Sequence, residues 1–223
     1  MHRFDTPAPV SALLDVPAGR VRFIAAERAD TTVEVLPADA SRCRDVKAAE
    51  QTTVEYGGGV LRIEAPAEKN RILGPSGAVE VTVQLPVGSR VEAKAVAAEF
   101  RGVGRLGDVA FGDGYRAVKL DEAASARLTV LDGDVSVGRL SGPAEISTQR
   151  GDIQITEAVR GTVTLRAEQG DISVGAAHGV SASLDASTGY GRIHNALRNT
   201  DGGAAGLNIR ATTSHGDITA RGL

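Results

Sequence analysis

Residues 126–179 read ARLTVLDGDVSVGRLSG (126–142), PAEISTQRGDIQITEAVRG (143–161) and TVTLRAEQGDISVGAAHG (162–179), three copies of one unit. Each unit contains an apolar residue, four further residues, Gly-Asp, an apolar-x-apolar triplet and a second glycine. The first glycine recurs at nearly equal intervals, at Gly133, Gly151 and Gly170. A fixed period of roughly 20 residues indicates a solenoid in which each repeat forms one coil.

The residues after each Gly-Asp alternate between apolar and polar, as at Ile153 and Ile155 or at Ile172 and Val174. Alternation with period two predicts strands whose apolar side chains face one way. No helical period persists, and glycine is abundant. The sequence therefore predicts an all-β fold, a single-stranded parallel β-helix (β-solenoid) with coils of about 18–19 residues. A contour of about 60 Å per coil encloses one thin apolar layer and leaves no room for a buried small molecule.

The Gly-Asp pairs are predicted to be structural corners of the coils. Glycine adopts positive φ without steric cost, and aspartate accepts hydrogen bonds from nearby backbone N–H groups. The predicted corner residues are Gly107, Asp108, Gly133, Asp134, Gly151, Asp152, Gly170, Asp171, Gly216 and Asp217. A further copy is aligned on Gly189, with Tyr190 in place of aspartate. A calcium-binding ladder is the alternative, but the nonapeptide spacing of calcium repeats is absent, so no metal is expected.

Residues 1–90 do not follow the repeat. Alternating runs separated by Pro-Ala-Gly (17–19) and Gly-Gly-Gly (57–59) predict antiparallel hairpins, with a short helix within 38–51. We therefore predict an antiparallel cap region at 1–90 and solenoid repeats at 91–223, continuous as one structural unit. Such a cap would cover the strand edges that an open stack exposes. The segments 65–78 and 198–206 are predicted to be exposed loops, either solvated or in contact with a partner.

The composition restricts the class of partner. The net charge is −3 and the basic residues are scattered, which argues against nucleic acid. No apolar run approaches the length of a membrane-spanning helix, so no membrane span is expected. The first residues lack the pattern of a secretory signal, and Cys43 is alone, which together predict a cytoplasmic protein. The alternative is a cell-surface protein whose leader was removed. Of the four histidines, His178, His194 and His215 occupy three different columns of the repeat, so no cofactor is predicted.

Several segments together resemble one bacterial family. LPVGSRVEAKA (85–95), LDASTGYGRIHNAL (184–197), SHGDITARGL (214–223) and the GDI/GDV units are similar to a β-strand-repeat family of unknown function labelled "putative adhesin". The resemblance covers essentially the whole chain. It implies a β-helix-like fold, an actinobacterial source and a role in adhesion, and it brings no established catalytic residue or cofactor.

We interpret the chain as a non-enzymatic structural or protein-interaction module that binds a protein partner or itself. The alternatives are an exported surface adhesin and a carbohydrate-active β-helix enzyme. The enzyme would need a carboxylate pair, and the chain has no Trp, three Tyr and four Phe to form a sugar groove.

The candidate interaction site is the place where the repeat departs from its pattern: Tyr190, Arg192, His194 and Asn195. Stacking the coils on the repeat also predicts an outward row of Ser147, Arg166, Asp185 and Thr212, with Arg166 paired to Asp185.

Overall fold

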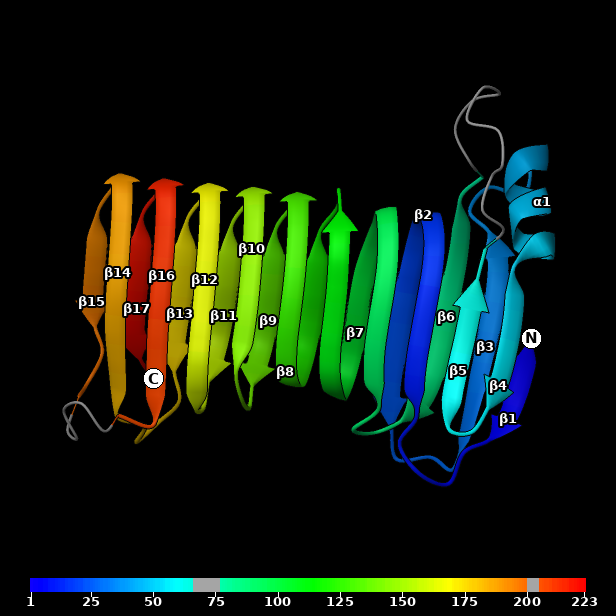
Figure 1. The fold of residues 1–223 in the computed structure, drawn as a ribbon, viewed down its shortest axis with the longest axis horizontal. Coiled ribbons are helices and arrows are strands. Elements are labelled where there is room, and N and C mark those ends of the chain that lie inside the picture. The colour runs from blue at the N-terminus through cyan, green and yellow to red at the C-terminus, as the bar shows by residue number, and fades with distance from the viewer. Residues whose placement is uncertain (66–76, 200–204) are drawn as a thin grey trace.

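A computed structural model describes residues 1–65, 77–199 and 205–223 (Figure 1). Most of the two predicted loops, at 65–78 and 198–206, therefore lies outside the described residues. Within those residues the chain forms seventeen strands and one helix, α1 (Cys43–Gln51). The strands are β1 (His2–Asp5), β2 (Ser11–Ala26), β3 (Asp30–Pro37), β4 (Thr53–Gly57), β5 (Val60–Glu64), β6 (Val79–Pro86), β7 (Arg90–Gly114), β8 (Val118–Asp132), β9 (Val135–Leu140), β10 (Ala144–Arg150), β11 (Ile153–Ala158), β12 (Gly161–Gln169), β13 (Ile172–Ala176), β14 (Ala182–Tyr190), β15 (Ile193–Ala196), β16 (Leu207–His215) and β17 (Ile218–Gly222).

The predicted all-β fold is confirmed, and its strands stack in an open, unclosed array. Ile146 on β10 lies beside Leu128 on β8 and Leu165 on β12, which are one repeat earlier and one repeat later in the chain. The strands β9, β11 and β13 pair in the same parallel way and form a second layer. The side chains that face inward from both layers, such as Ile153 and Leu165, are completely buried. We call each pair of successive strands that contributes one strand to each layer a coil.

The N-terminal region differs from the predicted antiparallel cap. The long strand β2 is parallel to β5, β6 and β7, and only β1, β3 and β4 add antiparallel pairings. The hairpin predicted at 17–19 is wrong, because β2 continues through Gly19, whose φ of +131° lets the strand turn from one layer to the other. The hairpin at 57–59 is confirmed, with positive φ at Gly58 and Gly59. The helix α1, inside the predicted range 38–51, packs on β3 and β6 at this end of the stack (Figure 1).

The coils at the other end do not follow sequence order. Strand β16 pairs with β12 on one side and with β14 on the other, and β17 lies in the same way between β13 and β15. The last coil of the chain is thus inserted into the stack, and the preceding coil, β14 with β15, is outermost (Figure 1). Burial follows this order. The inward residues Leu207 and Ile209 of β16 are buried, whereas Leu184 and Ala186 of β14 are only partly covered.

The predicted register of β14 is wrong by two residues. Aligning Gly189 with the repeat glycines would put Leu184 in the row of Leu165 and Ala211, but Leu184 lies beside Ile209. The corner falls at Gly191, with a φ of +155°, and not at Gly189. The predicted contact between Arg166 and Asp185 is wrong, because the whole of β16 separates their strands and the two residues occupy different rows.

The earliest predicted corner also lies elsewhere. Gly107 and Asp108 are inside β7, and Val109 is in register with Ala126, as Ala126 is with Ala144. Gly107 therefore shares its position with the second glycine of the repeat and not with Gly133. Glycine is required there because a Cβ would overlap the carbonyl oxygen of Gly88.

Candidate interaction surfaces

The corner aspartates form a hydrogen-bonded ladder along one side of the stack. The backbone N–H of Asp152 donates to Oδ1 of Asp134 at 2.9 Å, and the N–H of Asp171 donates to Oδ1 of Asp152 at 2.8 Å. The N–H of Asp217 continues the ladder to Oδ1 of Asp171 at 2.7 Å. The predicted structural role is therefore refined, since each carboxylate binds the corner of the neighbouring coil and not its own turn.

The ladder ends at Arg192 on the outermost coil. Its backbone N–H donates to Oδ1 of Asp217 at 2.8 Å, and its guanidinium lies 3.1 Å from Oδ2 of the same carboxylate. These two hydrogen bonds lower the pKa of Asp217 below its usual 3.8. Arg192 occupies the position that aspartate holds in the inner coils, so the outermost coil presents no carboxylate for a further corner.

The predicted interaction residues are all on this outermost coil. The ring of Tyr190, with 75% of the residue exposed, stacks on His215 of β16 with 5.1 Å between ring centroids. His194 lies on β15 beside Thr219, and Oδ1 of Asn195 accepts the backbone N–H of Leu197. The four predicted residues thus share a coil, but they are spread over both of its strands and the corner between them.

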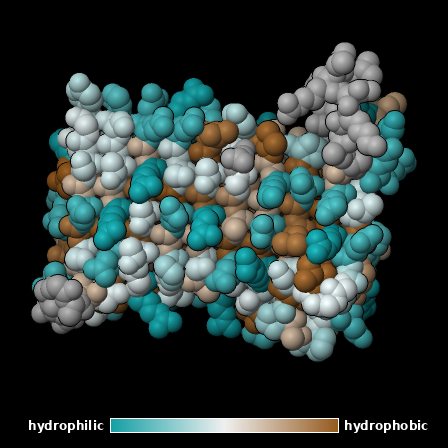
Figure 2. Space-filling view, in the orientation of Figure 1, coloured by the Kyte–Doolittle hydropathy of each residue, from teal (hydrophilic) through white to brown (hydrophobic). Residues whose placement is uncertain are grey.

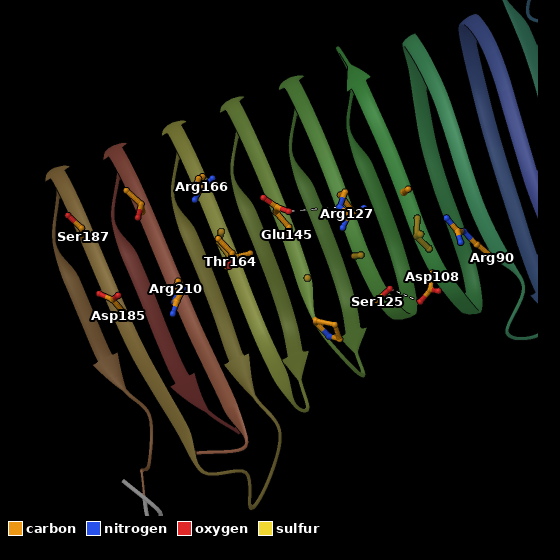
Figure 3. A pocket seen from close by; sticks show the side chains of 17 residues that line it. Arg90, Asp108, Ser125, Arg127, Glu145, Thr164, Arg166, Asp185, Ser187 and Arg210 are labelled. Carbon is orange, nitrogen blue, oxygen red and sulfur yellow. Dashed lines mark hydrogen bonds and ion pairs between the residues drawn. The ribbon is translucent and has the colours of Figure 1, made fainter. Parts of the chain in front are cut away.

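A shallow groove of about 650 Å³ crosses the outer face of the layer that contains β8, β10, β12, β16 and β14. It is lined by outward side chains of β7, β8, β10, β12, β16 and β14, which come from successive coils of the stack (Figure 3). Figure 2 shows this face as a mixture of hydrophilic and apolar residues without a broad apolar area. The backbone under the groove is mostly strand, so the side chains project from a rigid support.

Two arginines of the groove lack an ion pair within the described part of the chain. Arg127 lies 3.9 Å from Glu145, and Asp108 accepts a hydrogen bond from Ser125 at 2.6 Å. Arg166 on β12 and Arg210 on β16, in contrast, are exposed and have no carboxylate within 4.0 Å among the described residues.

Hydroxyl residues flank Arg166 on both sides and Arg210 on one side. In register, Arg166 lies between Ser147 and Thr212, and Arg210 lies between Thr164 and Asp185. The predicted row of Ser147, Arg166 and Thr212 is confirmed. Its fourth member is Ser187, because the corner of this coil is at Gly191 and puts Asp185 in the neighbouring row. The period therefore predicts most of this surface, and the corner of the outermost coil decides its last member.

Within residues 1–65, 77–199 and 205–223, no group of three or more His, Cys, Asp or Glu side chains is arranged to hold a metal ion. In the same residues, no helix has the length and apolar character needed to cross a membrane. Cys43 is exposed at the start of α1.

Residues 114–221 of the chain match the protein-family model described as Toastrack DUF4097. This Toastrack segment contains the repeat, the ladder and most of the groove, and the family has no known function. The resemblance that the sequence predicted is confirmed. No curated protein matches the chain.

Solved structures match the chain over nearly its whole length. A "putative adhesin" from Bacteroides fragilis is 14% identical with a TM-score of 0.61, and the match covers 98% of this chain and 95% of that one. A "putative adhesin" from Parabacteroides distasonis is 16% identical with a TM-score of 0.52 and the same coverage of 98% and 95%. At these identities the likeness shows the fold alone, which extends beyond the Toastrack segment to the N-terminal coils.

Proposed function

We propose that this chain is a non-enzymatic β-solenoid module that binds an acidic, extended segment of a protein partner in the groove over β10, β12, β16 and β14. The observation that carries this proposal is the pair Arg166 and Arg210, which project into the groove without an ion pair among the described residues. The fold neighbours named as adhesins support an interaction role in general terms.

The arginines define the chemistry of the segment. A guanidinium presents planar donors that match carboxylate geometry, and the flanking hydroxyls of Thr164 and Thr212 add donors and acceptors. The two arginines lie on neighbouring strands and are offset by two residues, which places their Cα atoms about 8 Å apart. Carboxylates two residues apart on an extended peptide have nearly the same spacing, about 7 Å.

The remaining features favour a peptide over other anionic ligands. None of the described residues that line the groove is aromatic, so bases or sugars have no platform on which to stack. Glu145 and Asp185 stand near the arginines and would repel a uniform polyanion such as nucleic acid. A peptide can place neutral or basic residues opposite these carboxylates.

The test is binding of a fluorescein-labelled peptide of alternating glutamate and serine, followed by fluorescence anisotropy at low ionic strength. We expect binding that weakens with added salt and that falls at least tenfold in the double variant Arg166→Ala/Arg210→Ala. The matched control is Arg22→Ala/Arg62→Ala, which removes two exposed strand arginines outside the groove.

A peptide of alternating glutamine and serine should not bind, because it lacks the carboxylates. The proposal is wrong if the glutamate peptide fails to bind the unaltered protein, or if both double variants bind it equally well.

A further inference from the structure

The outermost coil is the one coil of the described stack whose two strands each have a single neighbour. Among the described residues, strand β14 pairs with β16 alone, and β15 pairs with β17 alone. Both strands therefore present a free edge, and these edges lie side by side at one end of the molecule (Figure 1). An unpaired edge of this length is a template for further strand pairing.

The apolar interior is also open at this end. Ile193 is in register with Ile218, and Ile218 with Ile172, yet Ile193 is 45% exposed whereas Ile218 and Ile172 are 1% and 0% exposed. Leu184 and Ala186 of β14 are likewise only partly covered. Hydrophobic atoms reach the left margin of the surface in Figure 2, where this coil lies.

We infer that this end is a self-association surface, on which a second copy of the chain stacks coil to coil about a two-fold axis. Strand β14 then pairs antiparallel with β14 of the second copy, and the end face of that copy covers Ile193, Leu184 and Ala186. This inference goes beyond the proposed groove function and uses none of the groove arginines.

A second copy fits this end better than a single peptide strand does. The coil has two free edges in two layers, and a peptide can pair with only one of them. A second copy presents two edges at the same separation, which is the self-complementarity that a two-fold interface requires. Pairing centred on Ala186 sets Asp185 of each copy against Ser187 of the other, so that like charges do not oppose.

The area of the end face is enough for a specific but weak dimer. Strand β14 has nine residues, which corresponds to a length of about 30 Å. Two layers about 10 Å apart, with their outward side chains, give a width of about 20 Å. The end face is then roughly 600 Å² per copy, or about 1,200 Å² for both, at the lower limit of specific protein interfaces.

The opposite end of the stack does not offer the same surface, so the assembly stops at two copies. There β1, β3 and β4 run antiparallel to the strands they join, and α1 covers β3 and β6. The edge strands β1 and β4 are short, with four and five residues. Since this end differs from the β14–β15 end, stacking yields a closed pair of molecules and no filament.

The test is the molar mass in solution by multi-angle light scattering over a hundredfold range of concentration. We expect a reversible shift from monomer to dimer for the unaltered protein and a monomer throughout for Ile193→Lys. The matched control is Leu36→Lys, because Leu36 is 47% exposed and lies on β3 at the other end, and this variant should still dimerise. The groove variant Arg166→Ala/Arg210→Ala should dimerise as well, which separates this test from that of the peptide.

Hydrogen exchange gives a second readout that needs no variant. The amides of β14 should exchange at least several-fold more slowly at the concentration where the dimer forms, whereas those of β1 should not change. A monomer at every concentration, a dimer that survives Ile193→Lys, or a mass that grows beyond the dimer would each overturn the inference.

Discussion

The inner and outermost coils of this molecule place an isoleucine in the same row, but its exposure to solvent differs. Ile153 on β11 is completely buried, whereas Ile193 on β15, in the same row of the stack, is 45% exposed. Both follow a corner glycine by two residues. The difference arises from the neighbouring coils, because Ile153 has a coil on each side and Ile193 has a coil on one side only. In such a stack, burial depends on position in space more than on position in the repeat.

Truncation of the two isoleucines gives the largest expected effect. Ile153→Ala should lower the free energy of unfolding by about 2–5 kcal/mol, because it leaves a cavity between two coils. Ile193→Ala should cost about 1 kcal/mol, because roughly half of the removed surface is already in contact with water. Urea unfolding at a concentration where the protein is monomeric measures both values. Equal losses would show that the outermost coil is covered within a single molecule.

The corner ladder offers a smaller effect that depends on one hydrogen bond. Asp152→Ala removes the acceptor of the Asp171 N–H and should cost about 1 kcal/mol, whereas Asp152→Asn keeps an oxygen in place and should cost less. The control is Asp185→Ala, since Asp185 makes no ion pair or hydrogen bond within the described residues. If all three variants unfold at the same urea concentration, the ladder does not stabilise the stack.

The end of the ladder gives the smallest effect, which depends on pH. Arg192→Ala should raise the pKa of Asp217 only part of the way to 3.8, because the backbone N–H of residue 192, the larger cause of the lowered pKa, remains. A lowered pKa in the folded state stabilises the fold above the unfolded value of 3.8, and this contribution disappears as the pH falls through the lowered pKa. The unaltered protein should therefore have a larger free energy of unfolding than Arg192→Ala at neutral pH, and this difference should vanish in acid.

Titration of the Asp217 carboxyl carbon by NMR measures the shift directly. Arg198→Ala removes another exposed arginine that has no ion pair among the described residues, and it should leave the titration unchanged. An identical Asp217 pKa in Arg192→Ala and in the unaltered protein would contradict the role of the guanidinium.

Most of the stack could be predicted from the sequence because each coil repeats the same short pattern of corner and inward-facing residues. The residues Gly151, Asp152 and Ile153 indicate a corner and an inward strand without reference to any distant residue. In the structure Gly151 has a positive φ, Asp152 accepts the N–H of Asp171 and Ile153 is buried. The order of the last coils could not be predicted in this way. The segments 182–196 and 207–222 both carry the pattern, and periodicity does not state which coil binds which neighbour.

The candidate surfaces could likewise be predicted only in part from the sequence. The row of Ser147, Arg166 and Thr212 follows from the period, but the place of Asp185 depends on the corner at Gly191, which the alignment on Gly189 misses. Tyr190 and Arg192 stand out in the sequence because they break the pattern. Their position at a free end of the molecule, and hence their relation to self-association, could be recognised only in three dimensions.

The inserted coil also has a consequence for how a nascent chain acquires this structure. A solenoid made in sequence order can add each coil to a finished edge as the ribosome releases it. Here β14 and β15 emerge before β16 and β17, and the finished parallel edge that they meet is that of β12 and β13, the native site of the later strands. The pairing of Leu165 with Ala211 closes a loop that contains β13, β14 and β15, so the entropy of closing this loop delays the final step. The last two coils can therefore assemble only once β16 and β17 are available, and early pairing of β14 with β12 would be a kinetic trap that has to open first.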